Sequence, residues 1–191
     1  MWVSLSSIYG LYSSSLAVQR TDSTDVIFQS SDGILFCLHR KNLETHSDAF
    51  PGPEIPVNEL DVANLTEPSE VLAIIFDFMY PRRQDDIEKM DYDIVAQVAE
   101  AVEKYQIFSA IQTCVLRLKC VIVYFKSALH SNTVLIQRQL VSTHAAEVMA
   151  HGIKHDYPSL VNEALPFLAR RPLVEVLKKL PSQYYLPWVR A

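Results

Sequence analysis

Two histidines four positions apart, His151 and His155, form a pair whose type and spacing could do chemistry. Positions i and i+4 share one face of a helix, so the two imidazoles could bind a metal ion together. However, Gly152 stands where the motif of a zinc protease needs a glutamate, and no third ligand is evident. We therefore interpret the histidines as a surface pair near a helix end and expect no metal, with a metal site as the alternative.

Three cysteines, Cys37, Cys114 and Cys120, could supply a nucleophile or a disulfide. Their odd number and the absence of a Cys-x-x-Cys spacing do not fit a disulfide framework, which favours a reducing compartment. Cys37 and His39 could act as a nucleophile and its base, but Cys37 lies inside an apolar run, where thiols are usually inert. We therefore expect no catalytic residue.

The glycine content and the charge argue against phosphate and nucleic-acid chemistry. The chain has four glycines, and only Gly33 lies in a turn between two apolar runs, which leaves no loop that could cradle a phosphate. Its 17 basic residues are outnumbered by 22 acidic ones, and the densest basic groups are pairs such as Arg82-Arg83. Because nucleic-acid binding relies on basic residues gathered on one surface, we expect no direct contact with nucleic acid. We also expect no cofactor.

The overall composition is that of a globular protein. The 191 residues are 49% hydrophobic and 20% charged, and a chain of this length can bury a core without metals or disulfides. No apolar run approaches the roughly 20 residues that cross a bilayer, so we expect no membrane partner and an intracellular protein of the cytoplasm, the nucleus or both. Residues 1–24 are serine-rich, and we interpret them as a flexible leader. A signal peptide is the alternative, but the segment has no basic residue at its start.

A β-hairpin is the clearest element that the sequence predicts. The runs 26–28 and 34–38 are apolar, and the turn between them contains Asp32-Gly33, a strong short-range hairpin signal. Because both runs are almost wholly apolar, we expect strands that are covered on both faces.

Most of the remaining chain carries helical patterns. Their boundaries depend on capping residues and on prolines, which favour the first turn of a helix and end a preceding one. A short extended piece is expected around 60–62. The helices are expected at 39–50, from 66 or 67 to 79, from 91 or 93 to 105, and at 108–119, 144–155, 158–169 and 172–181.

The segment 121–143 differs from its helical neighbours on both sides. It has no acidic residue, many β-branched residues and no firm period. We interpret it as an atypical insert of uncertain structure, and we hypothesise that it is a mis-joined gene segment such as a retained intron. Sequencing the mature transcript tests this hypothesis, and finding the codons of the segment in the dominant message would contradict it.

Three segments together resemble the BTB/POZ family in their order and spacing. Residues 25–43 are similar to its opening signature, in which an Asp precedes the first strand and His-Lys/Arg-x-x-Leu follows the second. Residues 74–80 resemble the family's LLxFIY helix, and residues 99–107 its AAEKYQL helix. Residues 80–83 and 150–158 resemble a fungal branch in which a few short helices follow the BTB fold.

The resemblance implies an α+β fold, in which a small sheet is flanked by a helical cluster and followed by a short C-terminal helical extension. We divide the chain into the flexible leader at 1–24, a BTB/POZ-like domain at 25–120, the atypical insert at 121–143 and the helical extension at 144–191. Within the domain, Tyr105 ends an apolar stripe with a hydroxyl that needs a partner.

Members of this family self-associate or dock onto other proteins. The resemblance therefore implies a non-enzymatic protein–protein interaction module, a self-associating scaffold or adaptor that forms a homodimer. The alternatives are a substrate adaptor of a cullin-type ubiquitin ligase and a transcription-associated regulator. The ligase adaptors often carry an apolar-x-Glu motif beyond the first long helix, and the region 53–59 has no clear match to it. The family-matched interface residues are Asp25, Val26, His39 and Arg40, and we also expect His39 to form a hydrogen bond across the strand-to-helix turn.

Overall fold

The computed structural model divides the chain into two compact units, Met1–Cys114 and Val115–Ala191. Within the described residues the fold is mixed α+β, with one three-stranded sheet and six helices, which confirms the expected α+β class. The flexible leader predicted at 1–24 lies outside the described residues. The structure describes residues 26–50, 62–81, 87, 90–128, 134–169, 174, 176, 178 and 182, with the backbone alone from 123 to 128 and from 134 to 143.

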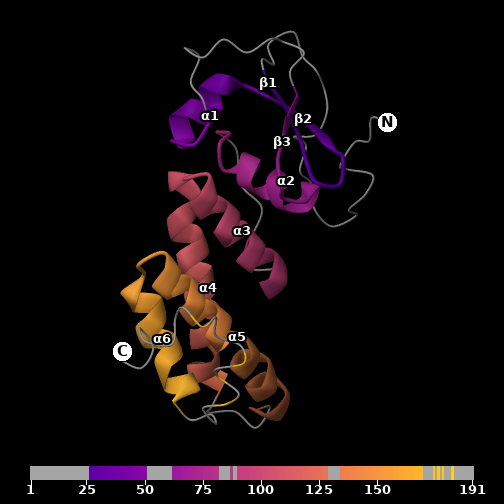
Figure 1. Cartoon of the computed structure of the whole chain (residues 1–191). Helices are drawn as coiled ribbons and strands as arrows, with labels where there is room; N and C mark the ends of the chain where they lie inside the picture. The colour runs from indigo at the N-terminus through magenta and orange to yellow at the C-terminus, as the bar shows by residue number, and fades with distance from the viewer. Residues whose placement is uncertain are drawn as a thin grey trace. The chain divides into compact units, whose positions relative to one another are not determined.

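The first unit holds the sheet (Figure 1). Strand β1 (Val26–Gln29) pairs antiparallel with β2 (Leu35–Leu38) and parallel with β3 (Val62–Asn64), which gives the order β2-β1-β3. The predicted hairpin is therefore confirmed. In its turn, Gly33 has a φ of +82°, a left-handed angle that glycine adopts without steric cost.

The strands differ in burial. In β2, Phe36, Cys37 and Leu38 are at most 5% exposed, whereas three of the four residues of β1 are half-buried. The edge strand β3 is exposed at all three positions. The apolar pattern predicts that both hairpin strands are covered on both faces. Of these two strands, only β2 is buried in this way.

Aromatic side chains from distant parts of the sequence form the core of the first unit. The ring centroid of Phe76 lies 5.8 Å from that of Phe28 and 5.3 Å from that of Phe36. It also lies 6.3 Å from the ring of Phe50, which stacks on Tyr105 at 5.1 Å. Offset and edge-on contacts of this kind add to the free energy of burying the rings.

Three complete helices and the beginning of a fourth belong to the first unit. They are α1 (Arg40–His46), α2 (Ser69–Asp77), α3 (Tyr92–Lys104) and the first residues of α4 (Phe108–Ala128). Helix α1 ends four residues before the predicted end at Phe50. The reason is that Ser47 has an extended backbone, pairs with Ile107 and donates its hydroxyl proton to the carbonyl oxygen of Tyr105.

The second unit contains the remainder of α4 from Val115, α5 (Val134–Lys154) and α6 (Pro158–Leu168). Helices α5 and α6 pack against each other (Figure 1). A Cβ atom added to Gly152 of α5 would lie only 3.0 Å from Cβ of Leu160 of α6, so the close approach of the two helices favours glycine at this position.

The described parts of the segment 121–143 are helical. They extend α4 to Ala128 and begin α5 at Val134, and the residues between these helices lie outside the described part of the chain. Because β-branched residues lower helix propensity only slightly, their abundance does not exclude a helix. The origin of the segment as an insertion stays a hypothesis.

Other boundaries agree more closely with the sequence. Helix α3 begins beside Asp91 and α6 begins at Pro158, as the capping residue and the proline predict. Of the helix predicted at 172–181, the described positions 174, 176 and 178 are helical. None of the described helices is both long enough and apolar enough to span a bilayer.

Candidate interface site

The open end of the hairpin brings three of the four expected interface residues together. Val26 of β1 lies opposite Leu38 of β2, and His39 and Arg40 follow Leu38 directly along the chain. Val26, His39 and Arg40 are each half-buried, so part of each side chain reaches the surface. The fourth residue, Asp25, lies outside the described residues.

His39 is positioned by a tyrosine that lies 41 residues later in the chain. Its backbone N–H donates a hydrogen bond of 3.1 Å to the hydroxyl oxygen of Tyr80, and Nδ1 of its ring lies 2.9 Å from the same oxygen. The two rings meet edge to face, with centroids 5.8 Å apart. The carbonyl oxygen of His39 also accepts hydrogen bonds from the backbone N–H groups of Asn42 and Leu43 at the strand-to-helix junction.

The sequence contains a signal for this contact. A tyrosine that ends an apolar helix pattern places its ring in the core and needs a partner for its hydroxyl. Tyr80 follows the apolar helix pattern of 71–79 just as Tyr105 follows its own, so the same rule applies to both residues. Tyr80 therefore orients His39, which is one of the expected interface residues.

The hairpin turn is attached to the beginning of α2 by Asp32. Its carboxylate accepts a hydrogen bond of 2.8 Å from the backbone N–H of Ser69 and another of 2.6 Å from the Ser69 hydroxyl. The backbone N–H of Ser31 also donates to the carbonyl oxygen of Glu67 at 3.0 Å. A carboxylate at a helix N-terminus satisfies a free amide and interacts favourably with the helix dipole.

This contact corrects the cap that the sequence suggested. The sequence predicts that this helix begins at 66 or 67, but Pro68 occupies the N-cap position and has no side-chain hydrogen bond to the helix amides. Asp32, 37 residues before Ser69, supplies the carboxylate instead. Burial by itself would raise the pKa of Asp32, but hydrogen bonds from Ser30 and Ser69 outweigh it and lower that pKa below 3.8.

Glu67 attaches the segment before α2 to the end of α3. It accepts a hydrogen bond of 2.5 Å from the Tyr105 hydroxyl, and it forms an ion pair of 2.6 Å with Lys104. The ammonium group of Lys104 lies 4.8 Å from the centre of the Tyr105 ring. The expectation that the Tyr105 hydroxyl needs a partner is therefore confirmed.

The charges of this cluster stabilise one another. Burial would raise the pKa of Glu67, but the hydrogen bonds from Lys104 and Tyr105 outweigh it and hold that pKa below 4.5. Burial would lower the pKa of Lys104, and Glu67 reverses this effect, so that pKa lies above 10.5. Both groups therefore stay charged at neutral pH and hold α3 to the segment before α2.

Two of the three cysteines, Cys37 and Cys114, are buried. Burial, with a smaller contribution from the charge of Glu103, raises the pKa of Cys114 to about 12. Cys37 is 5% exposed within β2, and all three cysteines are free thiols. Because the thiolate is the nucleophilic form, burial of this kind disfavours catalysis at Cys37 and Cys114.

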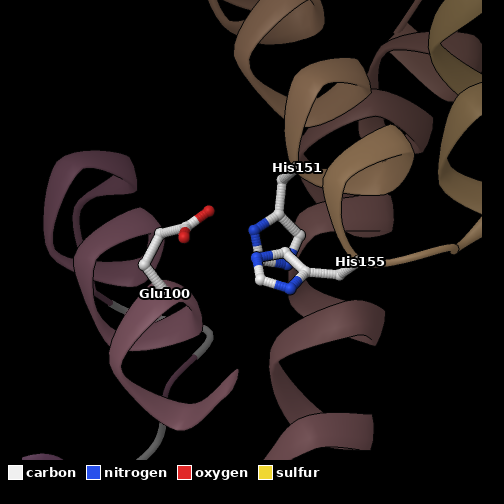
Figure 2. A group of neighbouring side chains, drawn as sticks. All are labelled: Glu100, His151 and His155. Atoms are coloured by element: carbon white, nitrogen blue, oxygen red, sulfur yellow. The ribbon is translucent and has the colours of Figure 1, made fainter. Parts of the chain in front are cut away.

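The histidine pair of the second unit differs from its sequence interpretation. We had expected a surface pair, but His151 is 7% exposed, and only His155 is half-buried. Their ring centroids lie 4.5 Å apart (Figure 2).

A scan against protein-family models found no matching family, and a search of curated proteins found no match to this chain.

Proposed function

We propose that the chain is a non-enzymatic, self-associating protein-interaction domain of the BTB/POZ type. The observation that supports this proposal best is a shared core. The three segments that resemble the family, 25–43, 74–80 and 99–107, contribute Phe36, Phe76 and Tyr105 to one aromatic cluster. The segments are far apart in sequence, and a common core gives the resemblance a physical basis.

The polar side chains of the first unit support a scaffold rather than a reaction. Asp32 and Glu67 each accept hydrogen bonds from fixed partners that join two elements of the fold. His39 has its ring against the hydroxyl of Tyr80. Asp32, Glu67 and His39 are each oriented by a partner in another segment, so we infer that they hold a defined surface in place.

The surface that we propose for self-association is the open end of the hairpin together with the beginning of α1. Val26, His39 and Arg40 lie there, half-buried and held by β-pairing and by Tyr80. Partly buried arginines are common anchors of protein interfaces, because the guanidinium combines a flat apolar surface with several hydrogen-bond donors. A second copy of the chain would meet this end of the hairpin.

A charge reversal at Arg40 tests the proposal. Sedimentation velocity of the full chain at micromolar concentration is expected to show a dimer, and Arg40→Glu is expected to weaken it at least about tenfold, since an interface anchor contributes roughly 2 kcal/mol or more. Lys41→Glu is the matched control, because it makes the same charge change at the next, exposed residue and should leave the dimer unchanged.

Two outcomes would contradict the proposal. A wild-type monomer at these concentrations would exclude self-association, and an equal effect of both substitutions would place the interface elsewhere. Thermal unfolding of each variant shows whether it is folded, and Arg40→Ala provides a milder change if Arg40→Glu is not. A ubiquitin-ligase adaptor would instead bind a purified cullin, and the region 53–59, which corresponds to the place of the adaptor motif, lies outside the described residues.

A further inference from the structure

His151 and His155 present two imidazoles side by side on one helix face (Figure 2). Their ring centroids are 4.5 Å apart with an angle of 47° between the ring planes. One ring nitrogen of each residue lies within 4.8 Å of the other. Glu100, which the figure also draws, belongs to the first unit and is not a member of this pair.

The end of α5 fixes the backbone beneath both rings. The N–H of His155 donates to the carbonyl oxygen of His151 at 3.0 Å, so the helical hydrogen bonding continues through His155. Asp156 then has a φ of +58°, and the N–H of Tyr157 donates to the carbonyl oxygen of Gly152 at 2.7 Å. This reversal is a Schellman-type helix end, which holds His155 as the C-cap directly after Lys154, the last residue of α5.

Packing restricts the His151 ring further. The ring is 7% exposed and lies nearly parallel to that of Tyr157, with centroids 6.2 Å apart. Next to His151, Gly152 allows α6 to approach α5 closely. A ligand side chain whose conformation is limited in this way loses less entropy when it binds a metal ion.

We propose that His151 and His155 form a two-histidine site for a divalent transition-metal ion of the zinc, nickel or copper class. Imidazole nitrogen is a preferred ligand for these ions. A tetrahedral ion with metal–nitrogen distances of about 2.0–2.1 Å places its two nitrogens roughly 3.3 Å apart. A rotation of the half-buried His155 ring would bring its nitrogen to this separation from the more restricted His151 ring, because the two residues lie one helical turn apart.

The site has two protein ligands and therefore leaves coordination positions open to water or to a ligand from another molecule. The imidazoles bind the ion in their neutral form, so acidification releases it. This site is independent of the proposed self-association, since its residues belong to the second unit and the interface residues to the first. It also goes beyond the sequence interpretation, which expected no metal at these histidines.

Equilibrium dialysis of the full, untagged chain against Zn²⁺, and separately against Ni²⁺, tests the proposal. The wild type is expected to bind one ion that His155→Gln binds at least about tenfold more weakly, since loss of even an outer-shell partner costs about 10–100-fold in metal affinity. His46→Gln is the matched control, because His46 lies at the end of α1 in the first unit. His151→Gln should match His155→Gln, and far-ultraviolet circular dichroism confirms that each variant is folded.

Equal binding by the wild type, His155→Gln and His46→Gln would overturn the proposal. So would a loss of binding in His46→Gln alone. Nuclear magnetic resonance of the imidazole protons supplies a second readout, which does not depend on the affinity. Zn²⁺ should shift the signals of His151 and His155 before those of His46, and unshifted signals for His151 and His155 at saturating Zn²⁺ would also contradict the site.

Discussion

A different kind of contact joins the helices and strands within each of the two units. In the first unit, hydrogen bonds between side chains and distant segments join the elements: Asp32 to Ser69, and Glu67 to Tyr105. These partners lie 37 and 38 residues apart in the sequence. In the second unit, α5 and α6 are neighbours in the chain, and they approach each other closely at Gly152.

This difference predicts which kinds of substitution lower the stability of each unit. A contact between distant segments fixes one element relative to another, and it depends on charge and hydrogen bonding. A close approach of neighbouring helices depends on side-chain volume, because a packed interface has no room for additional atoms. Substitutions at these particular contacts should therefore act through polarity and pH in the first unit, and through side-chain size in the second.

Gly152→Val is expected to have the largest effect, and it tests the second unit. An added Cβ alone would lie 3.0 Å from Cβ of Leu160 and 3.2 Å from the carbonyl oxygen of Tyr157, and valine adds two further methyl groups. Overpacking of this kind costs about 1–3 kcal/mol, and we expect a value near the upper end in urea denaturation.

Ala150→Val is the control for this substitution, since it adds the same methyl groups on the same helix at a half-buried position. It should cost less than half as much as Gly152→Val. Combining Gly152→Val with Val161→Ala should recover part of the lost stability, because alanine lacks the Cγ2 atom of Val161, which would lie 3.2 Å from the added Cβ. Strict additivity of the two substitutions would contradict close packing at Gly152.

Asp32→Ala is expected to have an intermediate effect, and it tests the first unit. It removes the carboxylate that accepts hydrogen bonds from Ser69, and the loss of a helix cap typically costs about 1 kcal/mol. Asp32→Asn retains one acceptor and should cost less. Hydrogen exchange should become faster in the hairpin and α2 but not in α6, and equal acceleration in α6 would contradict the division into separately held units.

Glu67→Gln is expected to have the smallest effect at neutral pH, under about 1 kcal/mol, because Lys104 is half-exposed and its ion pair is screened. The pKa of Glu67 is below 4.5 in the folded chain, so its contribution is present above pH 4.5 and is lost as the pH falls through the folded value. The variant should therefore lose less stability than the wild type on acidification. Urea midpoints at neutral pH and below pH 4.5 measure the loss of stability on acidification. The exposed Glu44→Gln is a control that should lose as much stability as the wild type.

Local patterns predicted much of the fold. The hairpin depended on Asp32-Gly33, and the starts of α3 and α6 depended on Asp91 and Pro158, so each signal lay within the element that it specified. The extent of α4 and α5 was missed, because the segment 121–143 has no hydrophobic period although its described parts are helical.

The side-chain partners could not be predicted in the same way. The register of the hairpin places Val26 opposite Leu38 and so near His39, and this follows from the position and length of the turn. The contacts of His39 with Tyr80 and of Asp32 with Ser69 depend on how the elements pack, and periodicity along the sequence does not contain that information. The burial of His151 was missed for the same reason.

Self-association is the central claim, and light scattering of the purified full chain tests it most directly. The account predicts a mass near twice the 21.7 kDa of one chain at micromolar concentration, which falls toward that of one chain on dilution. A mass of one chain at every micromolar concentration would contradict it.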